Sequence, residues 1–184
     1  MPKLGMEPIR RAALVKATIA EVGDAGSLDV AVSRIAKRAG MSSGLAHHYF
    51  GGKDEIFAAA MRQILRDYRA EVTAALRRTP DRAAALIEAS FAASCFAPET
   101  VAAWMTFYAQ AHTNPQAQRL LRLYQRRLRS NLTHALRGQV ADPGEAAATL
   151  AALIDGTYLA MAFGADPHGA ARVHTTLDSL RGQP

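Results

Sequence analysis

The stretch that decides the fold is VSRIAKRAGMSSGLAHHYF, at positions 32–50. Its first half spaces apolar residues three and four positions apart, which predicts one face of a short helix. Gly40 ends that helix because glycine adopts the positive φ of a helix end without strain, and Ser42 or Ser43 can cap a second short helix. The second helix carries few apolar residues, so it suits the major groove of DNA better than a protein core. The pattern therefore indicates a helix-turn-helix, with an ordinary corner between two helices as the alternative.

Helix signals continue along the rest of the chain, and no stretch alternates apolar and polar residues as a strand would. We therefore expect an all-α fold. Proline follows a capping-type residue four times, which predicts an N-cap and a first helical residue at each pair. These pairs are Thr79-Pro80, Asn114-Pro115, Asp142-Pro143 and Asp166-Pro167. The helices are expected near 7–23, 31–39, 43–50, 53–78, 80–96, 98–112, 115–137, 143–163 and 167–181.

Charge, cysteine count and the length of apolar runs limit what kind of protein this is. Residues 1–53 hold eight Lys and Arg against four Asp and Glu, which accounts for most of the net charge of +6. A basic surface of this kind favours phosphate backbones or acidic membranes. The single cysteine, Cys95, excludes an internal disulfide and a Cys-rich zinc site. No apolar run reaches the roughly 18 residues of a spanning helix and no signal-peptide pattern opens the chain, so we expect a cytoplasmic protein.

At residues 35–57 the chain resembles the DNA-binding signature of the TetR family of bacterial repressors. The residues that carry the resemblance are Ile35, Ala36, Gly40, Ser42, Gly44, Tyr49, Phe50, Lys53, Ile56 and Phe57. Further stretches, at 1–11, 46–50, 103–107 and 152–156, resemble the branch of that family that responds to choline and controls glycine betaine synthesis genes. The resemblance implies a three-helix helix-turn-helix DNA-binding domain over residues 1–53. It also implies a helical ligand-binding and dimerisation domain over residues 54–184, so that the fold has nine helices in all.

The resemblance also implies which residues contact DNA. Lys53 would touch a phosphate from the start of its helix, where the free N–H groups and the helix dipole favour an anion. A basic arm before and on the first helix would reach phosphates or a minor groove, and such binding weakens steeply as salt is raised. Family members often have an aromatic residue in place of His47 and histidine in place of Tyr49, so their base preferences do not transfer. The expected DNA-binding residues are Lys3, Arg10, Arg11, Ser42, Ser43, Gly44, His47, His48, Tyr49 and Lys53.

A candidate ligand site follows from aromatic residues at helical spacing in 98–112. Their simplest interpretation is core packing. The alternative is that Trp104, Tyr108 and Tyr158 present ring faces to a quaternary ammonium, which cannot donate hydrogen bonds. Asp155, inside an otherwise apolar helix, would then balance the charge, because a buried carboxylate needs a partner. The expected ligand-binding residues are Phe91, Trp104, Phe107, Tyr108, Asp155 and Tyr158.

The last two predicted helices are rich in alanine, and by resemblance they form the four-helix interface of a homodimer. Such a dimer would read a palindromic operator in double-stranded DNA, with half-sites one helical turn apart, about 34 to 36 Å, or a multiple of it. We therefore expect a ligand-responsive repressor of choline transport and choline-to-glycine betaine oxidation genes, with choline as the effector.

Two other functions stay open at this stage. One is the same DNA-binding fold with a different effector, namely a drug, a fatty acid or an acyl-CoA. The other is an all-α enzyme, which the sequence disfavours because it has no metal pair at ligand spacing, no phosphate-binding glycine loop and no nucleophile-base pair. No cofactor, metal or membrane partner is expected.

Overall fold

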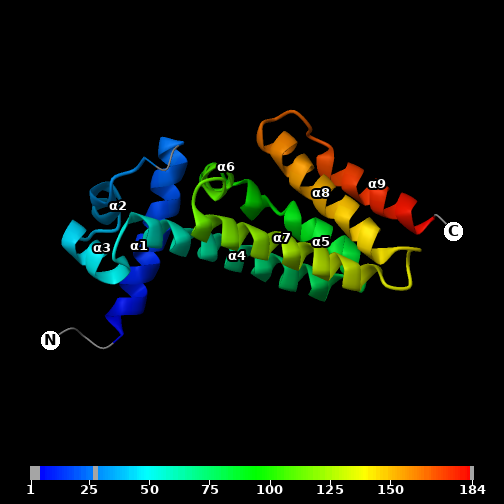
Figure 1. The fold of residues 1–184 in the computed structure, drawn as a ribbon, viewed down its shortest axis with the longest axis horizontal. Helices are drawn as coiled ribbons and strands as arrows, with labels where there is room; N and C mark the ends of the chain where they lie inside the picture. Colours follow the sequence, from blue (N-terminus) through cyan, green and yellow to red (C-terminus); the bar gives the residue numbers. More distant parts are fainter. Residues whose placement is uncertain (1–4, 27–28, 183–184) are drawn as a thin grey trace. The chain divides into compact units, whose positions relative to one another are not determined.

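The computed structural model describes residues 5–26 and 29–182 of the chain. Lys3, one of the expected DNA contacts, lies outside the described residues. Within them the structure has nine α-helices and one 3-10 helix, and no described residue lies in a strand (Figure 1). The elements are α1 (Met6–Ala25), α2 (Val32–Arg38), α3 (Ser43–Phe50), α4 (Lys53–Arg78), α5 (Arg82–Ser90), η1 (Ala93–Phe96), α6 (Pro98–Ala111), α7 (Pro115–Leu136), α8 (Pro143–Ala162) and α9 (Gly169–Arg181). The expected all-α fold is therefore confirmed.

Two of the four predicted proline caps are confirmed. The side-chain oxygen of Asn114 accepts backbone hydrogen bonds at the start of α7, at 2.9 and 3.1 Å. Asp142 does the same for α8, at 2.8 and 3.1 Å. In both helices proline follows the cap, where its missing N–H leaves no hydrogen bond unmade.

The other two predicted caps are wrong. Helix α5 begins after Asp81, whose carboxylate accepts from the backbone N–H groups of Ala83 and Ala84 at 3.1 Å each. The hydroxyl of Thr79 instead accepts from the Asp81 backbone. A carboxylate is the stronger cap because its charge also favours the positive end of the helix dipole. The side chain of Asp166 likewise does not cap α9, since it pairs with Arg172 at 3.1 Å.

The single helix predicted at 80–96 is also interrupted. It ends at Ser90, and a short 3-10 helix, η1, follows before α6. None of the η1 residues is buried. The buried face of α5 therefore does not extend into this segment.

The chain forms two compact units, and each is built from two separate stretches. The first contains residues 1–65 and 97–120, and the second contains residues 66–96 and 121–184. Helices α4 and α7 each contribute to both units.

In the first unit, α1 packs against α2, α3 and α6. The contact with α6 is very close, because a Cβ atom added at Gly23 would lie 2.5 Å from the Cα atom of Glu99. Glycine at position 23 is therefore needed for the packing of α1 on α6. A separate contact joins α1 to α2, where the buried carboxylate of Glu21 pairs with Arg34 and Arg38 at 3.0 Å each.

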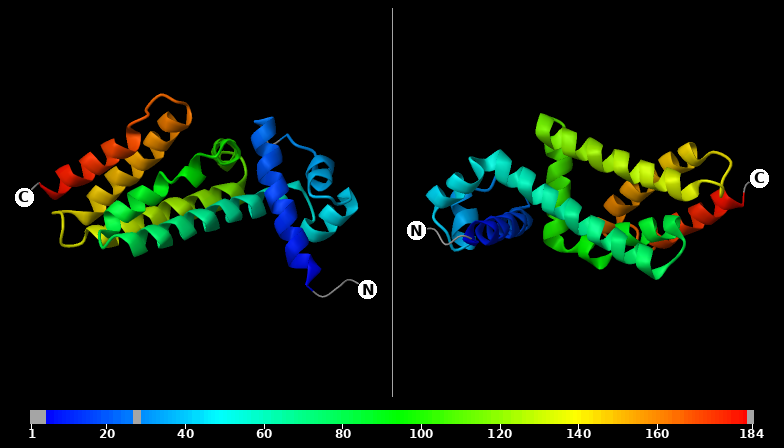
Figure 2. Two further views of the ribbon diagram at one scale, coloured as in Figure 1. Left: turned by 180° about the vertical axis from the view of Figure 1, so that it is seen from behind. Right: turned by 90° about the horizontal axis from the view of Figure 1, so that it is seen from below.

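In the second unit, α8 and α9 lie side by side and α5 packs against both (Figures 1 and 2). Leu132, Leu150 and Leu177 are fully buried in this core. The guanidinium of Arg181, at the end of α9, makes two hydrogen bonds of 2.8 Å to the carboxylate of Asp81. This pair ties the last helix to the start of α5 and holds the pKa of Asp81 at about 2, below its usual 3.8.

None of the described helices is long and apolar enough to span a bilayer.

Candidate functional site

The turn between α2 and α3 has the geometry that the sequence predicts. Gly40 has a φ of +68°, and the Met41 backbone N–H donates to the carbonyl of Ala36 at 2.9 Å, which closes the end of α2. The Ser42 hydroxyl accepts from the backbone N–H of Leu45 at 3.3 Å. Ser42 rather than Ser43 is therefore the N-cap of α3.

Helix α3 has one buried face and one exposed face. Ala46 and Phe50 point into the first unit, with 0% and 8% of their surface exposed. Gly44, His47 and His48 are exposed on the outer side. The helix therefore offers a polar surface made of small and imidazole side chains.

The glycine at position 44 has no internal explanation. A Cβ atom added there would meet nothing within 4 Å, and Gly44 is not among the glycines with a positive φ. Glycine is nevertheless the least favourable helix residue after proline, because its backbone loses the most freedom. A missing side chain at this exposed place would serve a close approach from outside the protein.

Two arginines of α1 hold α3 from the other side. Arg11 donates to the backbone carbonyl of Tyr49, and its guanidinium lies 4.3 Å from the centre of the Phe50 ring. Arg10 donates to the Tyr49 hydroxyl at 3.5 Å. Both arginines are half-buried. They therefore position the C-terminal end of α3, a role that their place in the sequence does not indicate.

Lys53 begins α4, as expected, and its ammonium lies 3.4 Å from the carboxylate of Asp29. The Asp29 side chain is fully exposed, so an ion pair there contributes little to stability. An arriving phosphate could replace that carboxylate at little cost.

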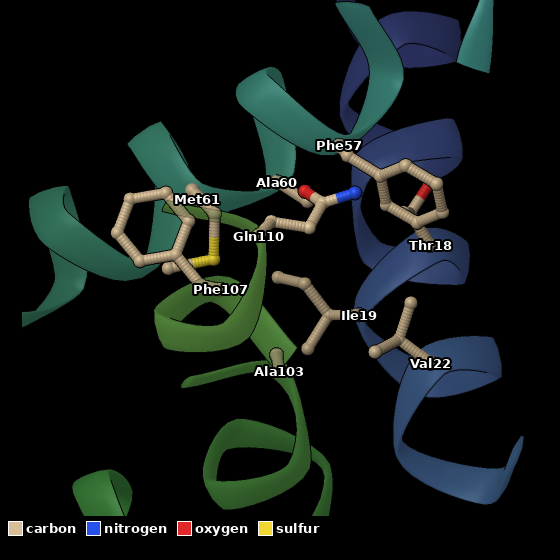
Figure 3. Close-up of a pocket in the computed structure, with 9 residues that line it drawn as sticks. All are labelled: Thr18, Ile19, Val22, Phe57, Ala60, Met61, Ala103, Phe107 and Gln110. Atoms are coloured by element: carbon tan, nitrogen blue, oxygen red, sulfur yellow. The ribbon is translucent and has the colours of Figure 1, made fainter. Parts of the chain in front are cut away.

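The aromatic residues expected to bind a ligand fall into two groups. Trp104, Phe107 and Tyr108 belong to the first unit, and the Trp104 ring centre lies 5.6 Å from each of the other two. Trp104 and Phe107 are buried, with 8% and 2% of their surface exposed. Phe107 and Gln110 line a cavity of about 20 Å³ where α1, α4 and α6 meet (Figure 3). That space holds about one water molecule.

The second group belongs to the second unit and includes Asp155 on α8. The Tyr124 hydroxyl donates to Oδ1 of Asp155 at 3.1 Å, and no ion pair involves Asp155 among the described residues. Burial raises the pKa of this carboxyl group, and the hydrogen bond from Tyr124 opposes the rise. Asp155 is therefore a half-buried acid with no cationic partner in the part of the chain that the structure describes.

Further aromatic rings of the second unit contact one another, and one of them, Tyr158, lies three residues after Asp155 on α8. The Tyr158 hydroxyl donates to the backbone carbonyl of Cys95 at 2.8 Å, and the Tyr158 and Phe96 ring centres are 4.9 Å apart. Phe91 stacks on the far side of Phe96, at 6.4 Å. Of the residues that the sequence singled out, Phe91, Tyr158 and Asp155 thus belong to one unit.

Two tyrosines of this group were missed as site residues in the sequence. Tyr68 lies with its ring edge toward Tyr124, at 5.9 Å, and its hydroxyl is 3.0 Å from that of Ser90. Burial raises the pKa of Tyr68 to about 12, and the charge of Asp155 adds to the rise. We use the name aromatic-carboxylate cluster for Asp155 and four aromatic residues of the second unit, namely Tyr68, Phe96, Tyr124 and Tyr158.

Comparison with known proteins decides the family. Residues 14–60 match the family of bacterial regulatory proteins described as the tetR family, and residues 79–180 match the C-terminal domain of BetI-type transcriptional repressors. The chain belongs to the TetR family. It is 49% identical over 178 residues to the HTH-type transcriptional regulator BetI of Brucella anthropi, covering 93% of this chain and 91% of that protein. With the protein of the same name from Rhizobium meliloti it shares 50% identity over 164 residues, covering 86% and 81% of the two chains.

Solved structures of other transcriptional regulators share this fold. A transcriptional regulator from Pseudomonas aeruginosa PAO1 superposes with a TM-score of 0.77 at 28% identity, covering 97% of this chain and 93% of that one. A regulator from Saccharomonospora viridis, crystallised in complex with choline, has the same fold with a TM-score of 0.79 at 20% identity, covering 91% and 95%. The matched BetI-type repressor family and the relatives named transcriptional regulators make this TetR-family chain a transcriptional repressor and not an enzyme.

Proposed function

We propose that this repressor senses choline and controls genes for choline uptake and for oxidation of choline to glycine betaine. The observation that carries the proposal is Asp155, a half-buried carboxylate without a cationic partner among the described residues. Its neighbours Tyr124 and Tyr158 belong to a group of rings in the same unit. Ring faces and one carboxylate attract a quaternary ammonium, which cannot be held by hydrogen bonds.

Two other observations support choline. The sequence resembles the choline-responsive branch of the family in both halves, and the matched family is the BetI type. A protein of the same fold, the Saccharomonospora viridis regulator, was crystallised with choline. Trp104, Phe107 and Tyr108 form a separate ring group in the first unit, and their role as ligand contacts stays a prediction from the sequence.

For DNA recognition we propose that residues 1–53 are the DNA-binding domain and that residues 54–184 bind the ligand and dimerise. The exposed side of α3 would enter the major groove. Base or backbone contacts would come from Ser42, Ser43, Gly44, His47, His48 and Tyr49, with phosphate contacts from Arg10, Arg11 and Lys53. Because it acts on operator DNA, we place the protein in the cytoplasm.

A homodimer through α8 and α9 is the proposed assembly. Ala152, Gly156, Leu159 and Phe163 are exposed along one side of α8, at spacings of three and four residues. Phe163 has 73% of its surface exposed, which is unusual for a large apolar side chain unless a partner covers it. A two-fold dimer would present two copies of α3 to a palindromic operator.

The decisive experiment measures operator binding by fluorescence anisotropy at fixed salt, and choline binding by calorimetry, for wild type and Asp155→Asn. The asparagine keeps an acceptor for Tyr124 but removes the charge. We expect choline affinity to fall at least about tenfold, which corresponds to about 1.4 kcal/mol, while operator binding without choline is unchanged.

Glu145→Gln provides the matched control, because Glu145 is an exposed acid on the same helix. It should bind choline as the wild type does. Betaine aldehyde, titrated in parallel, tests the second candidate effector. Wild-type choline affinity in Asp155→Asn would refute the proposed site, and specific operator binding that ignores choline would refute the proposed effector.

A further inference from the structure

The second unit contains a cleft that the proposed function does not use. It lies between the C-terminal half of α4, the start of α5 and the last turns of α7, and its volume is about 560 Å³. Small-molecule sites in proteins commonly have volumes of 300 to 1,000 Å³, roughly. The cleft therefore has room for a ligand of ordinary size.

One side of the cleft is apolar. Val72 and Leu76 on α4 are only half-buried, and Leu86 on α5 closes the floor with 3% of its surface exposed. These side chains leave hydrocarbon surface in contact with water. An apolar group placed against them would gain by removing that surface from water.

The other side is cationic. Arg82, at the start of α5, and Arg137, just after α7, both line the cleft and are exposed, as is His134. The lining contains no acidic residue. Elsewhere in this unit arginines do have carboxylate partners: Arg78 pairs with Glu88 at 2.6 Å and Arg181 pairs with Asp81.

Neither of the two cleft arginines has such a partner. Among residues 5–26 and 29–182, no ion pair involves the guanidinium of Arg82 or that of Arg137. Guanidinium groups bind carboxylates and phosphates through two parallel hydrogen bonds. The charge of the cleft is therefore complementary to an oxyanion.

We propose that this cleft is a second ligand site, which binds a small amphipathic oxyanion. The acidic head, a carboxylate or a phosphate ester, pairs with Arg82 and Arg137. A short hydrocarbon chain lies along Val72 and Leu76. The site differs from the aromatic-carboxylate cluster in both charge and lining residues, since the cluster presents a carboxylate and the cleft presents two guanidinium groups.

The test is calorimetric titration of the wild-type protein with octanoate and with octyl phosphate, both below their micelle-forming concentrations. We expect saturable binding of at least one, and the tighter of the two identifies the head group. Shortening octanoate to hexanoate should weaken binding roughly two- to fourfold per methylene removed. Hexanol, which has no charge, should bind at least tenfold more weakly than hexanoate.

Variants distinguish this cleft from other surfaces. Arg82→Gln and Arg137→Gln should each weaken octanoate binding at least tenfold. Arg126→Gln changes an exposed arginine of α7 that does not line the cleft, and it should bind octanoate within about twofold of wild type. Circular dichroism melting checks that all three variants fold.

Three results would overturn the proposal. If neither amphiphile binds the wild type, or if Arg137→Gln and Arg126→Gln bind alike, the cleft is not an oxyanion site. If choline and octanoate exclude one another, the amphiphile occupies the aromatic-carboxylate cluster instead. Asp155→Asn should retain octanoate binding whether or not it binds choline, so the two proposals fail separately.

Discussion

The glycine at position 44 allows a test in which stability and DNA binding change in opposite directions. The change is Gly44→Ala. The added methyl group meets nothing within 4 Å, and Gly44 is not among the residues of positive φ. Alanine reduces the freedom of the unfolded chain, which stabilises a compatible site by about 0.4 to 1 kcal/mol. Gly44 is the second residue of an eight-residue helix, so we expect about half a kcal/mol.

That gain corresponds to a rise in melting temperature of roughly 1 to 2 °C for a chain of this size. On DNA the same methyl group would occupy the space into which a base or phosphate must come. We expect operator affinity to fall at least about tenfold, or about 1.4 kcal/mol.

Thermal melting by circular dichroism and operator anisotropy at one fixed salt concentration measure the two effects. Thr73→Ala is the matched control, since Thr73 is exposed on α4 and its hydroxyl donates to the Arg69 carbonyl of the same helix. It should also stabilise the protein slightly and leave operator binding unchanged. If Gly44→Ala binds the operator as tightly as wild type, Gly44 does not lie at the interface. If it melts below wild type, the start of α3 differs from the structure described above.

Three other perturbations have defined outcomes. Asp81→Asn keeps the cap acceptor but loses the ion pair with Arg181, which is the largest cause of the lowered pKa of Asp81. The difference between a pKa of 3.8 and one of about 2 corresponds to about 2 kcal/mol. Partial exposure and the cap hydrogen bonds that asparagine keeps reduce the expected loss to roughly 1 kcal/mol. Because the folded pKa is the lower one, this contribution is present above pH 3.8 and disappears as the pH falls towards 2, so urea unfolding should show the wild-type advantage at pH 7 shrinking in acid. Gly156→Arg should yield monomers in analytical ultracentrifugation. A Cβ atom at Gly156 meets nothing within 4 Å in its own chain, so the arginine would clash only with a partner subunit on α8. A dimer that persists contradicts the α8 interface, and Thr73→Arg serves as the control. Trp104→Ala should lose the choline response but keep operator binding, and an unchanged response would exclude Trp104 from the effector site.

The features that the sequence predicts correctly are local ones, which depend on residues close together in the chain. The turn at Gly40, the Ser42 cap and the start of α7 after Asn114 each follow from a side chain and the few residues beside it. Thr79 was a wrong choice of cap because Asp81, two residues later, competes for the same N–H groups and carries a charge.

The candidate sites depend on distant residues, which explains what the sequence reading missed. Tyr68 fits the apolar stripe of its own helix, and nothing near it in sequence places it beside Tyr124. Arg10 and Arg11 stand in a basic stretch that predicts phosphate contacts, and nothing near them in sequence indicates that in the folded chain they also reach Tyr49, almost 40 residues away. Helix spacing determines which residues share a face, but tertiary packing determines what that face meets.

The close packing of α1 on α6 has a consequence for how the repressor is made. Helices α1 to α3 leave the ribosome first, yet α6, which covers α1 at Gly23, lies some 75 positions later in the chain. At synthesis rates of about 5 to 20 residues per second, α1 waits roughly 4 to 15 seconds for this partner. During that interval the face of α1 that packs on α6 is exposed to water, while its contacts with α2 and α3 can already form. The nascent chain therefore completes its DNA-reading unit only after much of the ligand-binding region has been synthesised.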